Sequence, residues 1–146
     1  MRLNRAVEYG IAGMMVLARA GRERSTMLRE VSMATSISET FLSKIFQKLV
    51  RNGLIRSRRG FRGGFHLARP ASQITLREVI EALQGPISFP SPGKHRHSNQ
   101  PSDTSGRSLL RQVLESAQAR VRAVFEETTV ADLATSGFPT SREKLV

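Results

Sequence analysis

Apolar side chains recur at helical spacing in the first part of the chain. Between residues 4 and 20 they return every three or four positions, with Asn4 able to cap the start of a helix and Gly21 able to end it. The members of this stripe are Val7, Ile11, Met14, Met15 and Ala18. A shorter pattern predicts a second helix over about residues 27–34, followed by a tight turn. Its inward-facing positions are Leu28, Val31 and Met33.

A third stretch, about residues 39–52, separates apolar from polar positions most clearly. Its apolar stripe consists of Leu42, Ile45, Phe46 and Leu49. Its opposite face consists of Thr40, Ser43, Lys44, Gln47 and Arg51. Ser38 can cap this helix, and a capping box of Ser36 with Glu39 fits as well, while Asn52 and Gly53 end it. Such short polar groups and cations suit base edges and phosphates, although an ordinary solvated surface helix shows the same pattern.

A basic β-hairpin is expected directly after this helix. Residues 54–57 and 64–68 are predicted strands, and the glycines between them suit a tight connection. From Arg51 to Arg69 there are six arginines and no acidic residue. This composition favours nucleic-acid contact over the alternative, a solubilising charge run. The hairpin positions assigned to DNA contact are Arg56, Arg58, Arg59, Arg62 and Gly63.

The second half of the chain contains two predicted helices separated by a polar segment. Thr75 caps the first, about residues 76–84, and residues 85–106 then read as a loop because apolar side chains almost disappear. The inward-facing positions of the first helix are Leu76, Val79, Ile80 and Leu83. The second helix, about residues 108–128, carries a continuous apolar side that needs a partner. The positions assigned to dimerisation are Leu110, Val113, Leu114, Ala117, Val121 and Val124.

These elements predict a mainly α-helical fold with one small β-hairpin. Two helices joined by a turn and followed by a basic hairpin are typical of a winged helix-turn-helix, extended here by a long C-terminal dimerisation helix. We divide the chain into a DNA-binding domain at residues 1–85, a flexible sensor-type loop at 86–106, the dimerisation helix at 107–133 and a tail at 134–146. In this arrangement the third helix enters the major groove and the hairpin follows the backbone or enters the minor groove.

Composition favours an anionic partner. The 146 residues include 23 Lys and Arg against 12 Asp and Glu, a formal net charge of +11, which suits nucleic acid or a membrane surface. No apolar run is long enough for a signal peptide or a membrane span, so we expect a soluble cytoplasmic protein of bacterial type that binds duplex DNA and no membrane. A sequence-neutral nucleic-acid-binding protein, architectural or RNA-binding, and a protein-interaction module remain alternatives.

Catalytic and metal sites find little support in the sequence. The hairpin glycines are not followed by the Lys-Ser/Thr of a phosphate-binding loop, and no nucleophile, base and orienting group can be assembled, so we do not expect an enzyme. His95 and His97 could share a metal ion, with Glu8 as another weak candidate, but further ligands are not evident. The sequence has no cysteine, which excludes disulfides and thiolate-held clusters in this chain.

Several motifs together resemble a known family. In chain order they are residues 1–3 (MRL), Tyr9, 37–42 (ISETFL), Leu49, 52–55 (NGLI), 57–68 (SRRGFRGGFHLA), 74–76 (ITL), 79–80 (VI) and 128–133 (TTVADL). They resemble the Rrf-type family of winged helix-turn-helix transcription regulators (IscR/NsrR/CymR-like). The resemblance covers nearly the whole chain, and the hairpin motif is its most specific part.

The resemblance implies a homodimer whose long C-terminal helices cross and whose two winged heads bind a palindromic operator. It places Arg59 where the family inserts an arginine into the minor groove. The third-helix positions that it assigns to recognition are Ser38, Thr40, Phe41, Ser43 and Lys44. Gln47 is added from its place on the polar face alone.

The chain departs from the family between the fourth and the long helix. Many members have three cysteines there that hold an iron-sulfur cluster, and residues 90–105 contain none. An acid at the position of Glu8 serves some relatives as a further ligand, but one carboxylate cannot hold a cluster without the sulfurs. Either the protein is a cluster-free member with an unknown effector, or Ser91, Ser98 and Ser105 replace native cysteines. In a chain without cysteine we expect no cofactor.

Overall fold

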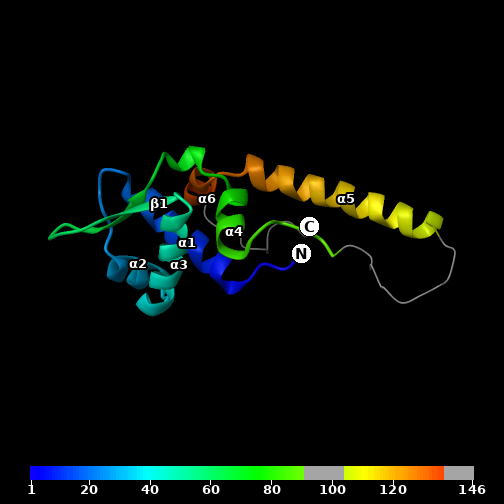
Figure 1. Cartoon of the computed structure of the whole chain (residues 1–146). Coiled ribbons are helices and arrows are strands. Elements are labelled where there is room, and N and C mark those ends of the chain that lie inside the picture. Colours follow the sequence, from blue (N-terminus) through cyan, green and yellow to red (C-terminus); the bar gives the residue numbers. More distant parts are fainter. Residues whose placement is uncertain (91–103, 137–146) are drawn as a thin grey trace, which may run out of the picture.

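The computed structural model describes residues 1–90 and 104–136, which form a mainly helical molecule with one two-stranded hairpin (Figure 1). In chain order the elements are α1 (Arg5–Ala20), α2 (Leu28–Thr35), α3 (Glu39–Arg51), β1 (Ile55–Arg58), β2 (Gly64–Leu67), the 3-10 turn η1 (Ala71–Gln73), α4 (Leu76–Gln84), α5 (Thr104–Glu127) and α6 (Val130–Ser136). The strands are antiparallel, with Ile55 opposite Leu67 and Arg58 opposite Gly64. This architecture confirms the predicted fold class.

Local capping explains where the main helices begin. The Asn4 side-chain oxygen accepts a hydrogen bond from the Val7 N–H at 3.0 Å, and Thr75 and Glu78 form a reciprocal capping box at the start of α4. For α3 the cap is Ser38, whose Oγ accepts from the Phe41 N–H at 3.4 Å. The alternative box of Ser36 with Glu39 is wrong, because Ser36 has a left-handed backbone (φ 58°) that ends α2.

The core forms where α1 meets α3, α4 and the hairpin. Phe46 of α3 is fully buried, and its ring packs edge-on against that of Phe65 in β2 with centroids 5.0 Å apart. On its other side Phe46 lies against α1 at Gly13, where a Cβ atom would come within 2.6 Å of the Phe46 ring. Ile55 and Leu67 are buried at the base of the hairpin. The hairpin is therefore rooted in the same core that holds α3.

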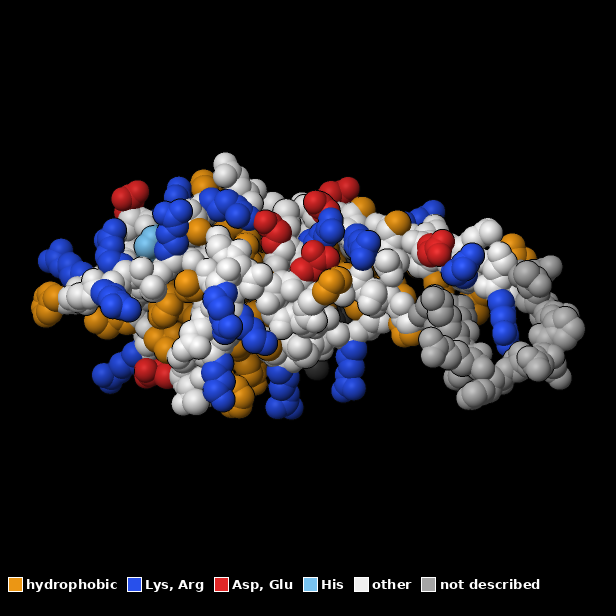
Figure 2. Space-filling model, in the orientation of Figure 1, with side chains coloured by type: hydrophobic (Ala, Val, Ile, Leu, Met, Phe, Trp, Pro, Cys, Tyr) orange, Lys and Arg blue, Asp and Glu red, His pale blue; other side chains and the backbone are white. Residues whose placement is uncertain are grey.

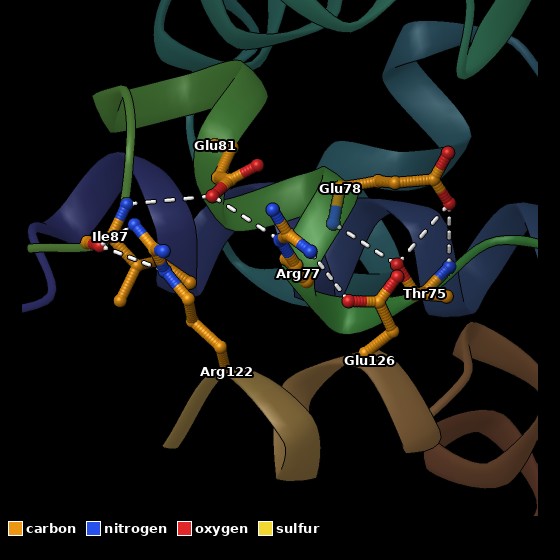
Figure 3. A network of polar contacts seen from close by, with 7 residues as sticks. All are labelled: Thr75, Arg77, Glu78, Glu81, Ile87, Arg122 and Glu126. Carbon is orange, nitrogen blue, oxygen red and sulfur yellow. Dashed lines mark hydrogen bonds and ion pairs between the residues drawn. The ribbon is translucent and has the colours of Figure 1, made fainter. Parts of the chain in front are cut away.

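A polar network fastens α5 to α4 (Figure 3). Arg77 of α4 pairs with Glu81 at 3.3 Å and with Glu126 of α5 at 2.5 Å. Arg122 of α5 donates through Nε and Nη2 to the Ile87 carbonyl oxygen, at 3.2 and 2.7 Å. These contacts hold the C-terminal half of α5, while its N-terminal half extends away from the helix-turn-helix as an arm (Figure 1).

The structure corrects the predicted boundaries at several points. α5 begins at Thr104, so the expected loop at 85–106 is too long at its end, and β1 begins at Ile55. Residues 130–136 form α6, which the apolar pattern did not predict, so the expected tail at 134–146 starts too early. Met33 is 75% exposed and does not face inward. Within the described segments, no helix combines the length and the apolar character needed to span a bilayer.

Candidate nucleic-acid interface

The hydrophilic side of α3 is turned outward. The four residues of its predicted apolar stripe are buried and pack it against the core. Of the predicted contact residues, Ser38, Thr40, Phe41, Lys44 and Gln47 are exposed and Ser43 is half-buried. α3 therefore presents hydroxyl, amide and ammonium groups on a free surface, as a helix that reads base edges must.

The arginines of the hairpin are also free. Arg56, Arg58, Arg59 and Arg62 are all exposed, and within the described residues none of these four takes part in an ion pair. Unpaired guanidinium groups with no acid beside them in sequence create a positive potential along the hairpin. Their charge is thus available to an external anion.

Gly63 has a structural role in this hairpin. Its N–H donates to the Gly60 carbonyl oxygen at 2.9 Å, and a Cβ atom at Gly63 would lie 2.6 Å from the Arg58 carbonyl oxygen. Only glycine permits that close approach. Gly63 therefore shapes the turn that carries Arg59 and Arg62.

α3 and the hairpin lie at one end of the molecule, and the free end of α5 lies at the other (Figure 1). The contact between Phe46 and Phe65 joins α3 to β2 directly. Figure 2 shows many Lys and Arg side chains over this end, with few acidic side chains among them. The two predicted DNA-binding elements are thus parts of one basic region.

His66 in β2 adds no charge to this region at neutral pH. Burial of the ring, together with the positive charges of Arg58, Arg56 and Arg22, lowers the pKa of His66 below its usual value. Its Nδ1 atom is buried without a hydrogen-bond partner among the described groups. The cationic character of the hairpin comes from its arginines alone.

Sequence reasoning did not assign a role to Phe61. This residue lies in the connection between the strands and is 96% exposed, the largest exposed fraction among the large hydrophobic residues described. The signal in the sequence is an aromatic residue inside an otherwise basic, glycine-rich connection. Phe61 therefore adds one exposed apolar group to a connection that otherwise carries free arginines.

The predicted dimerisation residues divide into two groups along α5. Leu110, Val113 and Val124 are at least half exposed, whereas Leu114, Ala117 and Val121 are only partly exposed. Leu109, which was not predicted, is 61% exposed on the same helix. α5 therefore keeps an uncovered apolar strip in the single chain.

The weak metal candidates are not brought together in the described residues. Glu8 is exposed on α1, and in residues 1–90 and 104–136 no three acidic or histidine side chains are close enough to share an ion. His95, His97, Ser91 and Ser98 lie outside the described residues. Ser105 belongs to the first turn of α5, but its side chain is not described.

Comparison with known proteins agrees with this geometry. The family model of Rrf2, described as an iron-dependent transcriptional regulator, matches residues 3–136. The HTH-type transcriptional regulator IscR of Cereibacter sphaeroides is 31% identical over 135 residues, covering 91% of this chain and 86% of the relative. CymR of Bacillus subtilis is 29% identical over 134 residues, covering 92% and 90%.

The fold is also that of a solved regulator. The structure of CymR, described as the global cysteine regulator of B. subtilis, superposes with a TM-score of 0.73 at 28% identity, over 92% of this chain and 97% of CymR. The resemblance predicted from the hairpin and helix motifs is confirmed, and the expected absence of an enzymatic role agrees with a family of regulators. The chain belongs to the Rrf2 family of DNA-binding transcriptional regulators.

Proposed function

We propose that this protein is a homodimeric regulator of a bacterial cytoplasm that binds a palindromic operator through α3 and the hairpin. The observation that carries the proposal is the outward polar face of α3 beside an arginine hairpin that lacks acidic residues. A major groove about 12 Å wide admits one α-helix. With α3 in that groove, the hairpin extends toward the neighbouring minor groove.

The two elements divide the work of binding. Thr40, Ser43 and Gln47 on α3 contact base edges, and Lys44 contacts either a base or a phosphate. On the hairpin, Arg59 enters the minor groove and Arg62 neutralises a phosphate. Each phosphate contact makes the fall of log K with log salt steeper by about 0.9.

Phe61 gives the hairpin an apolar tip. Aromatic and aliphatic side chains inserted at a base step unstack it and bend the duplex. We place the Phe61 ring against the sugars or a base step of the minor groove, where its 96% exposed surface becomes covered.

The exposed strip of α5 forms the dimer. Leu109, Leu110, Val113 and Val124 leave an apolar surface that a second copy of α5 covers. A twofold dimer presents two α3 helices to half-sites one helical turn apart, about 34–36 Å, or a multiple of that distance. The palindrome in DNA mirrors this symmetry.

The protein works without a cysteine-held iron-sulfur cluster. Such a cluster needs thiolate ligands, and the chain has no cysteine, so its residues do not fit that group.

The proposal is tested by selecting bound sequences from a random duplex library with the purified protein. We expect an inverted repeat, and we expect random duplex DNA to compete much less well than the selected site. Equal competition by random DNA or RNA would support the sequence-neutral alternative. Failure to bind any duplex at moderate salt, with capture of a stable protein partner, would support the interaction-module alternative.

A further inference from the structure

A hollow of about 330 Å³ lies between α1 and α3. Its walls are formed by Ala6 and Tyr9 of α1 and by Phe41 and Ile45 of α3. A volume of this size is at the lower end of the range for small-molecule sites. The hollow is large enough for one compact ligand.

The walls favour a flat, apolar group. Tyr9 and Phe41 meet edge to face, with ring centroids 6.4 Å apart and ring planes at 67°. Phe41 is a large aromatic residue, yet it lies on the hydrophilic side of α3 and is 58% exposed. A planar ring that packs against both aromatic side chains would cover this surface and gain stacking energy.

The rim is positively charged. Arg5, Lys44 and Lys48 line the hollow, and none of the described residues that line it is acidic. Within the described residues, these three cations form no ion pair. The Arg5 guanidinium group can bind a carboxylate through two parallel hydrogen bonds. The ammonium groups of Lys44 and Lys48 add positive charge and can bind from several directions.

We propose that this hollow binds a small aromatic carboxylate, with its ring against Tyr9 and Phe41 and its carboxylate on Arg5, Lys44 and Lys48. The ligand and DNA exclude each other, because Phe41 and Lys44 belong to both sites. This second statement rests on the proposed function of α3, whereas ligand binding does not. The hollow thereby acts as an effector site that releases the protein from its operator.

Other ligand classes fit the hollow less well. An inorganic phosphate would pair with the cations and leave the aromatic walls exposed. A neutral aromatic compound would cover the walls and leave three positive charges without a partner. Apolar walls and a cationic rim are both covered only by a ligand that has an aromatic ring and an anionic group in one molecule.

The hollow has a built-in reporter. The chain has one tyrosine and no tryptophan, so excitation beyond the absorption band of phenylalanine yields emission from Tyr9 alone. The test is a titration of the full chain with 2-naphthoate, followed by the heat of binding in a calorimeter and by Tyr9 emission corrected for ligand absorbance. We expect one ligand per chain, the same midpoint in both measurements, and at least tenfold weaker binding of the neutral 2-naphthamide.

Variants outside the proposed DNA contacts locate the site. Lys48→Gln removes one rim charge and Ala6→Leu fills the hollow, and each should weaken 2-naphthoate at least fivefold. Arg107→Gln on α5 makes the same change in net charge at an exposed position far from the hollow, and it should bind like the unaltered chain. Four results would each overturn the site. The first two are no binding at millimolar 2-naphthoate and equal binding of 2-naphthamide. The other two are displacement of 2-naphthoate by equimolar phosphate and unchanged binding in both Lys48→Gln and Ala6→Leu.

Exclusion of DNA is measured separately on the operator complex. A fixed 2-naphthoate concentration about tenfold above its Kd for the unaltered chain should raise the half-saturation concentration for operator about tenfold in that chain, and less in Lys48→Gln. If the ligand binds but operator affinity does not change, the effector role is overturned. If the unaltered chain binds no selected DNA, the proposed function and the effector role both fail, and calorimetry alone decides on the ligand site.

Discussion

Thr26 and Phe65 exchange two backbone hydrogen bonds, from the N–H of each to the carbonyl oxygen of the other, at 2.9 and 2.8 Å. Thr26 precedes α2 and Phe65 lies in β2, so this bridge ties the hairpin to the helix-turn-helix. Gly64 makes the approach possible, because a Cβ atom there would lie 2.5 Å from the Thr26 carbonyl oxygen. The bridge fixes the direction in which the hairpin leaves the core.

We expect Gly64→Ala to loosen the hairpin. The change adds a clash with the Thr26 backbone to the strain of an alanine at φ 146°, and should lower the free energy of unfolding by about 1–3 kcal/mol. Urea unfolding measures this loss, and operator affinity should fall with it. Gly60→Ala is the matched control, because Gly60 also has a positive φ but, apart from its two chain neighbours, no described atom lies within 4 Å of its added Cβ. Equal losses in both variants would contradict a role for the bridge.

Two hairpin arginines should respond differently to removal. Arg59→Ala should cost about 1–3 kcal/mol of operator binding and relax the preference for the operator, since a minor-groove arginine senses groove width. Arg62→Ala should weaken all duplexes uniformly and reduce the salt slope by about 1. Titrations of operator and random duplex at several salt concentrations separate the two effects. Unchanged affinity and preference in Arg59→Ala would remove Arg59 from the minor groove.

Phe61→Ala should affect DNA binding without affecting the fold. Because the ring is 96% exposed, its removal should change the free energy of unfolding by less than about 0.5 kcal/mol. Operator affinity should fall, and Phe61→Leu should restore part of it, because a leucine can also act as an apolar wedge. Bending of the operator, measured by energy transfer between dyes at its ends, should decrease in Phe61→Ala. Unchanged affinity and bending would show that the tip stays outside the groove.

The sequence predicts those parts of the fold that local chemistry determines. Asn4, Ser38 and Thr75 cap their helices through side chains that bond within the next three residues, so the starts of α1, α3 and α4 can be predicted. The start of α6 also has a local signal, a reciprocal capping box of Thr129 with Asp132, but its seven residues are too few for an apolar pattern to show a helix. Its place in the fold depends on tertiary contact, since the Val130 N–H donates to the distant Ile74 carbonyl oxygen at 2.9 Å. Both Ser36 and Ser38 could cap α3 by sequence alone. The structure selects Ser38 because Ser36 has a left-handed backbone, which its sequence position does not reveal.

The candidate sites divide in the same way. The outward face of α3 follows from its own periodicity, and the acid-free run 51–69 predicts a basic hairpin. Which of these arginines stay unpaired depends on the fold, since Arg69 of the same run pairs with Glu78. The hollow beside α3 cannot be predicted in this way, because Tyr9 and Phe41 meet only when α1 crosses α3. Local patterns therefore predict the surfaces of single elements, whereas sites between elements need the packed structure.

Val113→Glu should separate the dimer. Val113 is 64% exposed in the single chain, and a carboxylate there would have to be buried in the proposed interface without a partner. Sedimentation should give a dimer for the unaltered chain at micromolar concentration and a monomer for the variant. Ala119→Glu adds the same charge to an exposed position about 120° around α5, by the 3.6-residue period, and should remain dimeric. A dimeric Val113→Glu variant would place the interface elsewhere.

His66 should make stability depend on pH below neutrality. Burial and the charges of Arg58, Arg56 and Arg22 lower its pKa in the folded chain, whereas in the unfolded chain its pKa stays near 6.5. Above that value both states hold a neutral ring, and stability is unaffected. As the pH falls, the unfolded chain binds the proton first, so stability that is present near pH 7.5 is lost toward pH 5.

Replacement of this histidine isolates the effect from that of the carboxylates. We expect the free energy of unfolding in urea to decrease between pH 7.5 and pH 5 by a larger amount in the unaltered chain than in His66→Gln. The difference between the two decreases belongs to His66, since all other titrating groups are shared. Equal decreases would mean that the ring takes up its proton as readily in the folded hairpin as in the unfolded chain. In that case the neighbouring arginines would not act on His66.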